Sequence, residues 1–359
     1  MPHSLVTELT EGDRHLLHRS QEGFLPRQLF DIHAHLFHTR HFAPGQMPAF
    51  LEAGRGYGMA DYQAALAQWL PGCKVEGLFF GYPSVGNDRA GENNWVQSRV
   101  APWISRSHNR ALVLAAPEDD PAEVRKMIGS GVFVGIKPYR LYAGVPDTRE
   151  ASIESFAPEW MWEICHEYEG VLMLHLVKRG GITDADNVST LQSLCRRYPG
   201  CKVVLAHVAR SFNYRHAREG LHAIADLENV VVDTAAVTHA DAFRAALKTL
   251  GPQRVLWGSD YMLSDLRGSC ATTGDGFIWH YADLAAASDT DGSTLVGIES
   301  LLCLREACED LKLSEDSIQD IFRNNALRLL ASHLPPGTAP TASLKQEDRP
   351  TSAAPTPPA

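Results

Sequence analysis

Short apolar runs recur along the chain, and each is followed by a stretch with helical periodicity. Eight of them occur, at residues 29–32, 75–80, 111–115, 133–137, 171–176, 202–206, 230–233 and 254–258. The runs are mostly continuous in hydrophobicity rather than alternating, as expected of parallel strands that are covered on both faces. Eight β–α units in one chain predict an α/β protein with a single (β/α)8 TIM barrel.

The segments between the runs supply amphipathic helices. Clear periodicity is present at residues 121–128, 155–168, 188–198 and 240–250, and a last helical pattern covers residues 314–330. Two connections, from about residue 36 to 74 and from about 261 to 297, are too long for simple turns, and the first contains a predicted helix at 59–70. Because both follow a strand, they lie on the catalytic face of a barrel, where we expect them to act as lids.

Three regions are expected along the chain. Residues 1–24 form a helical lead-in, and residues 25–333 form the barrel. Residues 334–359 contain seven prolines, and the others are mainly Ala, Thr, Ser and charged residues. This composition cannot bury a core, so we expect a disordered tail.

Charge and composition narrow the class of protein. The chain has 359 residues, with 33 Lys+Arg against 43 Asp+Glu and a formal net charge of −10. An acidic chain without a basic run is a poor candidate for binding the phosphate backbone of nucleic acid. No stretch approaches the roughly 20 apolar residues of a membrane span, and the N-terminus lacks the apolar core of a signal peptide. The sequence therefore predicts a cytoplasmic protein that acts on a small molecule, and it leaves a homo-oligomer open.

Cysteine and histidine usage indicates where the chemistry lies. The seven cysteines are scattered without a C-x-x-C pair, which argues against a disulfide framework or a thiolate zinc site. Among sixteen histidines, His33 and His35 follow the first apolar run. Residues i and i+2 of a strand point the same way, so both imidazoles are expected on the barrel interior, where they suit one metal ion.

Polar side chains stand at the ends of three further runs. His175 ends the fifth, His207 the sixth, and Asp260 follows the eighth. The carboxyl ends of barrel strands converge on one mouth, so these residues are expected to share a site with His33 and His35. Imidazole and carboxylate suit zinc, iron or manganese and leave room for a water ligand.

Basic residues are also found at strand ends. Lys137 ends the fourth run, and three roles stay open for it: an anion contact, a surface charge, or a metal-bridging ligand carboxylated on its amine. Arg140, Lys178, Arg179 and Arg210 lie just beyond the fourth, fifth and sixth runs. Each is either a contact for a substrate carboxylate or a solvated surface charge.

The order of these motifs resembles that of the amidohydrolase superfamily over residues 30 to 330. The likeness is greatest to its amidohydrolase-related branch, which includes hydrolases, lactonases and aromatic or muconate-type decarboxylases. The sequence departs from the branch where Pro138, Tyr139 and Arg140 follow Lys137 in place of a histidine–proline pair. The motifs are Asp31-Ile32-His33-Ala34-His35, Gly135-Ile136-Lys137, His175, Leu205-Ala206-His207, Asn229-Val230-Val231-Val232-Asp233-Thr234, Gly258-Ser259-Asp260 and Asn325-Ala326-Leu327-Arg328.

The resemblance implies a divalent metal held by His33, His35 and Asp260. It implies His175 as a further ligand, and His207 as either a ligand or an acid–base group. Zinc is the metal expected, and one ion is favoured over two.

A metal with an open position lowers the pKa of bound water and polarises a carbonyl oxygen. Asp260 beside that water can take its proton. We therefore expect a metal-dependent hydrolase of a small anionic amide, ester or lactone. The alternative is a metal-dependent non-oxidative decarboxylase of an aromatic or unsaturated carboxylic acid.

Overall fold

Eight parallel strands form the centre of the molecule. The computed structural model describes residues 9–281, 293–338 and 340. Neighbouring strands follow one another in chain order, and the last lies against the first, where Ile32 N–H donates to Trp257 O at 3.1 Å. The strands are β1 (Gln28–His35), β4 (Lys74–Phe80), β5 (Arg110–Ala115), β6 (Phe133–Pro138), β7 (Val171–Leu174), β8 (Lys202–Leu205), β9 (Val230–Asp233) and β10 (Val255–Leu256). The predicted (β/α)8 barrel is confirmed.

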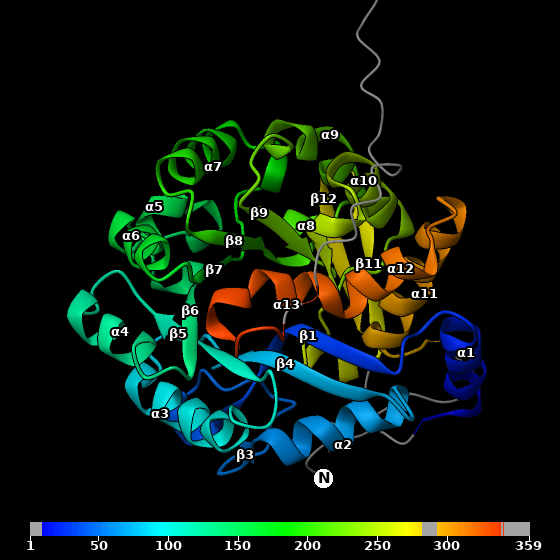
Figure 1. Cartoon of the computed structure of the whole chain (residues 1–359), viewed down its shortest axis with the longest axis horizontal. Coiled ribbons are helices and arrows are strands. Elements are labelled where there is room, and N and C mark those ends of the chain that lie inside the picture. Colours follow the sequence, from blue (N-terminus) through cyan, green and yellow to red (C-terminus); the bar gives the residue numbers. More distant parts are fainter. Residues whose placement is uncertain (1–8, 282–292, 339, 341–359) are drawn as a thin grey trace, which may run out of the picture.

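Helices surround the strands (Figure 1). They include α2 (Met59–Trp69), α3 (Arg89–Val100), α4 (Pro121–Ile128), α6 (Glu159–Glu167), α7 (Ala185–Arg197), α9 (Tyr214–Gly220), α10 (Ala240–Leu250) and α11 (Val296–Asp310). The single helix predicted at 155–168 is wrong, because α5 (Ile153–Phe156) ends before Pro158 and α6 begins after it. Proline lacks an N–H and disfavours helical backbone in the preceding residue. Within the described residues, no helix has both the length and the apolar character needed to span a membrane.

The interior of the barrel is filled by one side chain in two from each strand. Phe30 and Ile32 of β1 meet Leu78 and Phe80 of β4 in this inner cluster. Helix α13 (Asn325–Leu329) closes it from below through Ala326, Leu327 and the following Leu330. The intervening strand residues face outward and pack against the helices.

The end of the packed barrel lies close to the predicted boundary at residue 334. Leu334 is 7% exposed and belongs to the inner cluster, so the packed structure includes it. The greater part of the predicted tail, residues 341–359, lies outside the described residues.

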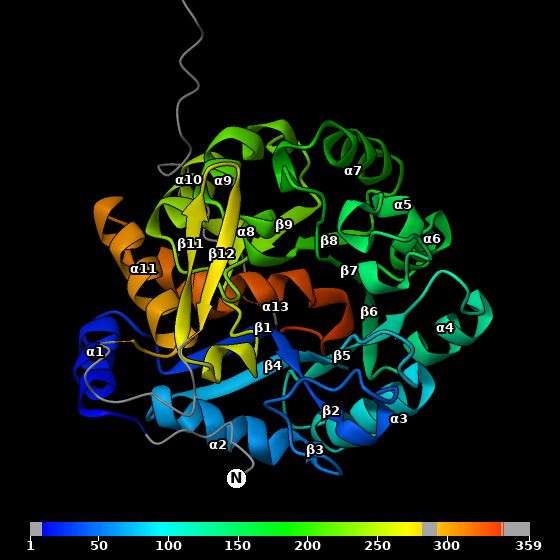
Figure 2. The ribbon, with the colours of Figure 1, turned by 180° about the vertical axis from the view of Figure 1, so that it is seen from behind.

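The two long connections carry structure of their own. The first contains β2 (Phe37–His38), β3 (Gly56–Tyr57) and the predicted helix α2. The second contains a hairpin of β11 (Gly268–Thr273) and β12 (Gly276–Tyr281), which the sequence analysis did not identify. Figure 2 shows this hairpin, in yellow, in front of the barrel, whereas α13 closes the other end.

The N-terminal helix α1 (Glu11–Gln21) is attached to the start of that hairpin. Asp13 forms a salt bridge with Arg267, and its Oδ1 also accepts a hydrogen bond from the Thr294 hydroxyl at 2.7 Å. Both charged side chains are buried, with 1% and 4% exposed. The predicted lead-in is thus bonded to the start of the hairpin, although residues 1–8 lie outside the described part.

Substitution of Asp13 by Ala is expected to lower the free energy of unfolding by about 3–5 kcal/mol, because Arg267 would stay buried without its carboxylate partner. Glu11→Ala in the same helical turn removes an exposed carboxylate and serves as the control. Urea denaturation of both variants measures the difference. Equal stability of the two variants would contradict this assignment.

Candidate active site

A β-bulge in β1 orients the side chains of His33 and His35 toward the barrel interior. Phe30 and Ile32 already occupy the interior, so strict alternation would turn His33 outward. The pairing of β1 with β4 shifts register between Asp31 and Ala34. This extra residue places His33 and His35 on the interior side above Phe80, whose ring centroid lies 5.1 and 4.6 Å from theirs.

A second irregularity does the same for Lys137. Val134 points into the interior three residues earlier, and the register of β6 shifts between Phe133 and Ile136. Gly135 lies within the shift, and a Cβ there would stand 1.9 Å from the Val171 carbonyl oxygen. Only glycine fits this close approach of two strands, and the resulting bulge brings Lys137 to the cavity.

His207 reaches the site through a left-handed turn. His207, Val208, Ala209 and Arg210 all have φ between 50° and 61°. The Asp233 carboxylate stabilises the start of this turn by accepting the His207 N–H at 2.7 Å. Left-handed backbone is unfavourable for residues with a Cβ, so the surrounding contacts must maintain it.

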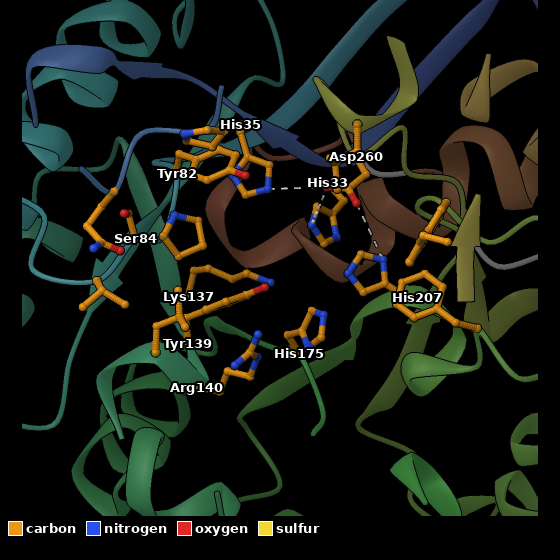
Figure 3. A pocket seen from close by; sticks show the side chains of 18 of the residues that line it. His33, His35, Tyr82, Ser84, Lys137, Tyr139, Arg140, His175, His207 and Asp260 are labelled. Carbon is orange, nitrogen blue, oxygen red and sulfur yellow. Dashed lines mark ion pairs between the residues drawn. The ribbon is translucent and has the colours of Figure 1, made fainter. Parts of the chain in front are cut away.

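Asp260 lies next to three of the histidines, to which dashed lines join it in Figure 3. Its Oδ1 lies 3.5 Å from His33 Nε2 and 3.4 Å from His35 Nε2, and its Oδ2 lies 3.9 Å from His207 Nδ1. Burial alone would raise the pKa of Asp260, but the charges of His33 and His207 and a hydrogen bond from His35 outweigh burial and hold the pKa well below its usual range. The carboxylate is therefore ionised.

The donor set fits a divalent cation. Ligand atoms of His33, His207 and Asp260 lie within 4.8 Å of one another, and all three residues are buried. His33 Nδ1 lies 2.9 Å from Asp233 and His35 Nδ1 lies 3.0 Å from Gly81 O, so a proton on each Nδ1 leaves Nε2 free as a ligand. Burial lowers the pKa of both His33 and His207, although Asp233 and Asp260 oppose this effect. The neutral form of each imidazole is the form that binds a metal ion.

The fifth predicted residue, His175, lies beyond His207. The centroids of the two rings are 4.9 Å apart, and His175 Nδ1 lies 2.9 Å from Leu176 O. Burial and the charges of His207, Lys137 and two arginines hold the pKa of His175 well below its ordinary value. The structure thus brings His33, His35 and His207 around Asp260 and leaves His175 at the edge of the group.

Lys137 is buried and lacks a hydrogen-bond partner among the described residues. Its Nζ lies 5.0 Å from the centroid of the Phe80 ring. Burial lowers the pKa of Lys137 to about 8, against the attraction of Asp233 and Asp260. A buried amine without a partner is costly, so a group absent from the protein chain is expected to meet it.

Two carboxylates that support the site had no role in the sequence analysis. Asp233 accepts the backbone N–H of His207 and contacts His33 Nδ1. Asp31 accepts bonds from the backbone of His33 at 3.0 Å and from Ser259 N–H at 2.9 Å, which joins β1 to the segment that bears Asp260. Burial raises the pKa of Asp31 to about 7 despite these donors. Asp31 and Asp233 both occur in the motifs that resemble the amidohydrolase superfamily, and this is the sequence feature from which their role could have been predicted.

The histidines and Asp260 border a cavity of about 420 Å³. Its walls also contain five aromatic residues that the sequence analysis missed, because loops carry most of them and loops have no periodicity. These are Tyr82, Tyr139, Phe212, Trp279 and Tyr281. The last two belong to β12, so the hairpin forms part of the wall.

The four predicted basic contacts lie in different places. Arg140 lines the cavity and bonds to Thr148 Oγ1 at 2.6 Å. Arg210 does not line the cavity, and its guanidinium carbon lies 5.1 Å from the centroid of the Phe277 ring. Lys178 is instead paired with Asp184 and Asp186, and Arg179 is exposed. The substrate contacts predicted at Lys178 and Arg179 therefore do not lie on the cavity.

Comparison with known proteins agrees with this architecture. The family model described as Amidohydrolase matches residues 30–331. A search of curated proteins found no significant match.

Several solved structures share the fold. An amidohydrolase from Burkholderia multivorans, determined with bound zinc, is 17% identical, with 86% of this chain and 100% of that chain covered and a TM-score of 0.55. A Pseudomonas putida protein assigned as a 2-pyrone-4,6-dicarboxylic acid hydrolase is 17% identical (87% and 100% covered, TM-score 0.52). The 2,6-dihydroxybenzoate decarboxylase from Rhizobium is 13% identical (85% and 98% covered, TM-score 0.51).

Asp233→Asn is expected to weaken binding of a divalent metal by roughly 10- to 100-fold. The substitution replaces the carboxylate that orients the His33 ring by a neutral amide, which holds the ring less firmly. Competition with a metal chelator measures this affinity. Asp226→Asn changes an exposed carboxylate before the same strand and is the control. An unchanged affinity in Asp233→Asn would rule out this role.

Proposed function

Since the chain belongs to the amidohydrolase family, we propose that it is a metal-dependent hydrolase in which water attacks the carbonyl carbon of a small amide, ester or lactone. The observation that carries this proposal is the buried group of His33, His35, His207 and Asp260 at the wall of a cavity. The family includes both hydrolytic and decarboxylating relatives in the fold comparison, so the reaction rests on the site rather than on the fold.

Zinc is the proposed metal, with one ion favoured. His33, His35 and Asp260 would hold it, and His207 Nε2 is free either to join them or to move a proton, since its Nδ1 lies 2.8 Å from Ala235 O. When bound, such an ion lowers the pKa of water and polarises a carbonyl oxygen.

The side chains around the proposed metal site would perform the proton transfers. Ionised Asp260 accepts the proton of the attacking water. Neutral His207 and His175 lie side by side at the cavity, where they can pass that proton to the leaving group. The aromatic wall limits access of bulk water around the reacting carbonyl.

Decarboxylation is the second candidate, and the aromatic wall is the observation that favours it. Tyr82, Tyr139 and Trp279 suit a flat, conjugated acid, and Arg140 is a cation for its carboxylate. In this reaction His207 or His175 would relay a proton to the carbon from which CO2 leaves.

Substitution of a predicted ligand, His33→Ala or Asp260→Ala, is expected to remove metal and activity together. A site with so few ligands loses most of its metal affinity when one ligand is removed. Elemental analysis gives the metal content. A panel of lactones, amides and aromatic acids, scored for hydrolysis and for CO2 release, gives the reaction. His222→Ala, which alters an exposed histidine, is the control. Full activity of chelated, metal-free protein would refute metal dependence.

Variants of Lys137 distinguish one ion from two. With one ion, Lys137→Ala keeps the metal and weakens substrate binding. If instead a carboxylated Lys137 bridges two ions, fully active enzyme holds two metals, reconstitution depends on bicarbonate, and Lys137→Glu partly restores what Lys137→Ala loses. Metal-to-protein ratios and KM values are measured against exposed Lys126→Ala. A ratio near two in active enzyme would overturn the one-ion arrangement.

A further inference from the structure

A second cavity lies at the opposite end of the barrel from the catalytic one. Residues 74–76 in its wall begin β4, whereas Tyr82 in the wall of the catalytic cavity follows the end of that strand. Helix α2, which lies beside β4 (Figure 1), and the segment 103–109 form the rest of the wall. The volume of this cavity, about 470 Å³, lies within the range of roughly 300–1,000 Å³ that small-molecule sites occupy.

One part of this second cavity is apolar. Leu66 on α2 and Leu70 directly after it are both buried in its wall. Val75 and Trp103 add apolar surface and are half-buried. Removing apolar surface from water is favourable, so an apolar group of a ligand gains free energy by covering these side chains.

The polar part of the cavity carries surplus positive charge. Exposed Lys74 and Arg106 border it, and its one acid among the described residues is Glu76, which is 3% exposed. Glu76 Oε2 lies 2.8 Å from His108 Nδ1 and 3.0 Å from Arg323 Nη2. Burial raises the pKa of Glu76, but these two partners outweigh burial and hold the pKa below its ordinary value. The single carboxylate in the wall is therefore ionised and already paired.

Arg106 is available to an anion from outside the chain. Its guanidinium carbon lies 4.5 Å from the centroid of the Trp103 ring. Within the described part of the chain, this guanidinium group forms no ion pair and no side-chain hydrogen bond. Stacking on the ring leaves the N–H groups free, and a planar guanidinium group recognises a carboxylate through paired hydrogen bonds.

A buried donor lies on the same segment as Arg106. Asn109 borders the cavity and is 2% exposed. Its Oδ1 accepts the Gly77 N–H at 2.8 Å, which fixes the orientation of the amide group. Among the described residues, Asn109 Nδ2 has no acceptor. Buried polar groups are nearly always hydrogen-bonded, so we expect an acceptor that the chain itself does not supply.

Tyr62 connects the second cavity with the catalytic site. It is buried in the cavity wall, and its hydroxyl donates to Asp31 Oδ2 at 3.0 Å. Asp31 accepts the backbone N–H groups of His33 and Ser259. Since His33 and the residue after Ser259, Asp260, are proposed metal ligands, a molecule bound against Tyr62 acts on both strand ends through one carboxylate.

We propose that the second cavity binds a small amphipathic monocarboxylate as an effector. The apolar part of this molecule covers Leu66 and Leu70, and its carboxylate meets Arg106 and Asn109. Tyr62 transmits its binding to the Asp31 carboxylate and so to the metal site. Binding at this cavity is independent of the proposed hydrolase function, whereas the effect on the metal site rests on it.

Octanoate and octan-1-ol test the binding, because they share an alkyl chain and differ in the charge of the head group. Both are titrated calorimetrically into the purified protein. Octanoate is expected to bind about tenfold tighter, since only its carboxylate can pair with Arg106. Ala67→Phe, which extends a large side chain from the cavity wall, is expected to abolish octanoate binding. Arg106→Gln is expected to remove the preference for octanoate.

Two substitutions outside the cavity wall are the matched controls, and both should bind octanoate like the wild type. Ala64→Phe enlarges another exposed alanine of α2. Arg99→Gln alters an exposed arginine whose guanidinium carbon lies 3.9 Å from the centroid of the Trp95 ring, the same kind of stacking as at Arg106.

Three results would overturn the binding site. The first is octanoate that binds no tighter than octan-1-ol, and the second is an octanoate affinity that Ala67→Phe leaves unchanged. The third comes from size-exclusion chromatography of the same proteins. A wild-type dimer that Ala67→Phe dissociates would assign the cavity to a second copy of the chain instead.

Zinc affinity, measured by chelator competition with and without saturating octanoate, tests the effect on the metal site. Octanoate is expected to change this affinity at least about fivefold in the wild type and not in Ala67→Phe. Tyr62→Phe keeps the ring and loses the hydroxyl, so it should bind octanoate without the change in zinc affinity. An unchanged affinity in the wild type, or an equal change in Tyr62→Phe, would refute the effector role. A protein that binds no zinc would contradict the proposed function and leave the octanoate binding results valid.

Discussion

One buried carboxylate, that of Asp233, connects the main parts of the site. It contacts the ring of His33 from β1 and accepts the backbone N–H of His207 at the end of β8. It also accepts the Ala235 N–H at 3.1 Å, which fixes its own strand end. Burial opposes its ionisation, yet the His33 and His207 interactions keep the pKa of Asp233 lowered. Three strand ends are thereby held at fixed separation by a single ionised group.

The barrel could be predicted because its signal lies in continuous stretches of residues. Parallel strands covered on both faces leave apolar runs, and all eight runs became strands. Polar residues directly after such runs predicted the shared mouth, and His33, His35, His207 and Asp260 do meet there. The helix break at Pro158 was not predicted, although the proline is evident in the sequence. The helical periodicity on both sides of Pro158 favoured a single helix.

The directions of the side chains could not be predicted in the same way. His33 and His35 were predicted on the barrel interior, where the structure has them, but strict alternation from Phe30 and Ile32 would point His33 outward. The register shift in β1 that turns His33 inward has no sequence signature of its own. Lys137 depends on the shift at Gly135, and His207 depends on a turn that its residue types disfavour. Lys178 also follows a strand, but it does not lie at the cavity, because it forms ion pairs with Asp184 and Asp186. Long-range contacts decide these orientations.

The turn from His207 to Arg210 also depends on the assembly of the barrel. No local preference selects four successive left-handed residues, so an isolated chain segment would rarely adopt this shape. The Asp233 carboxylate that stabilises the turn arrives only when β9 has joined β8. The position of His207 is therefore coupled to the pairing of β9 with β8. The shape of the site is a property of the assembled barrel rather than of any one chain segment.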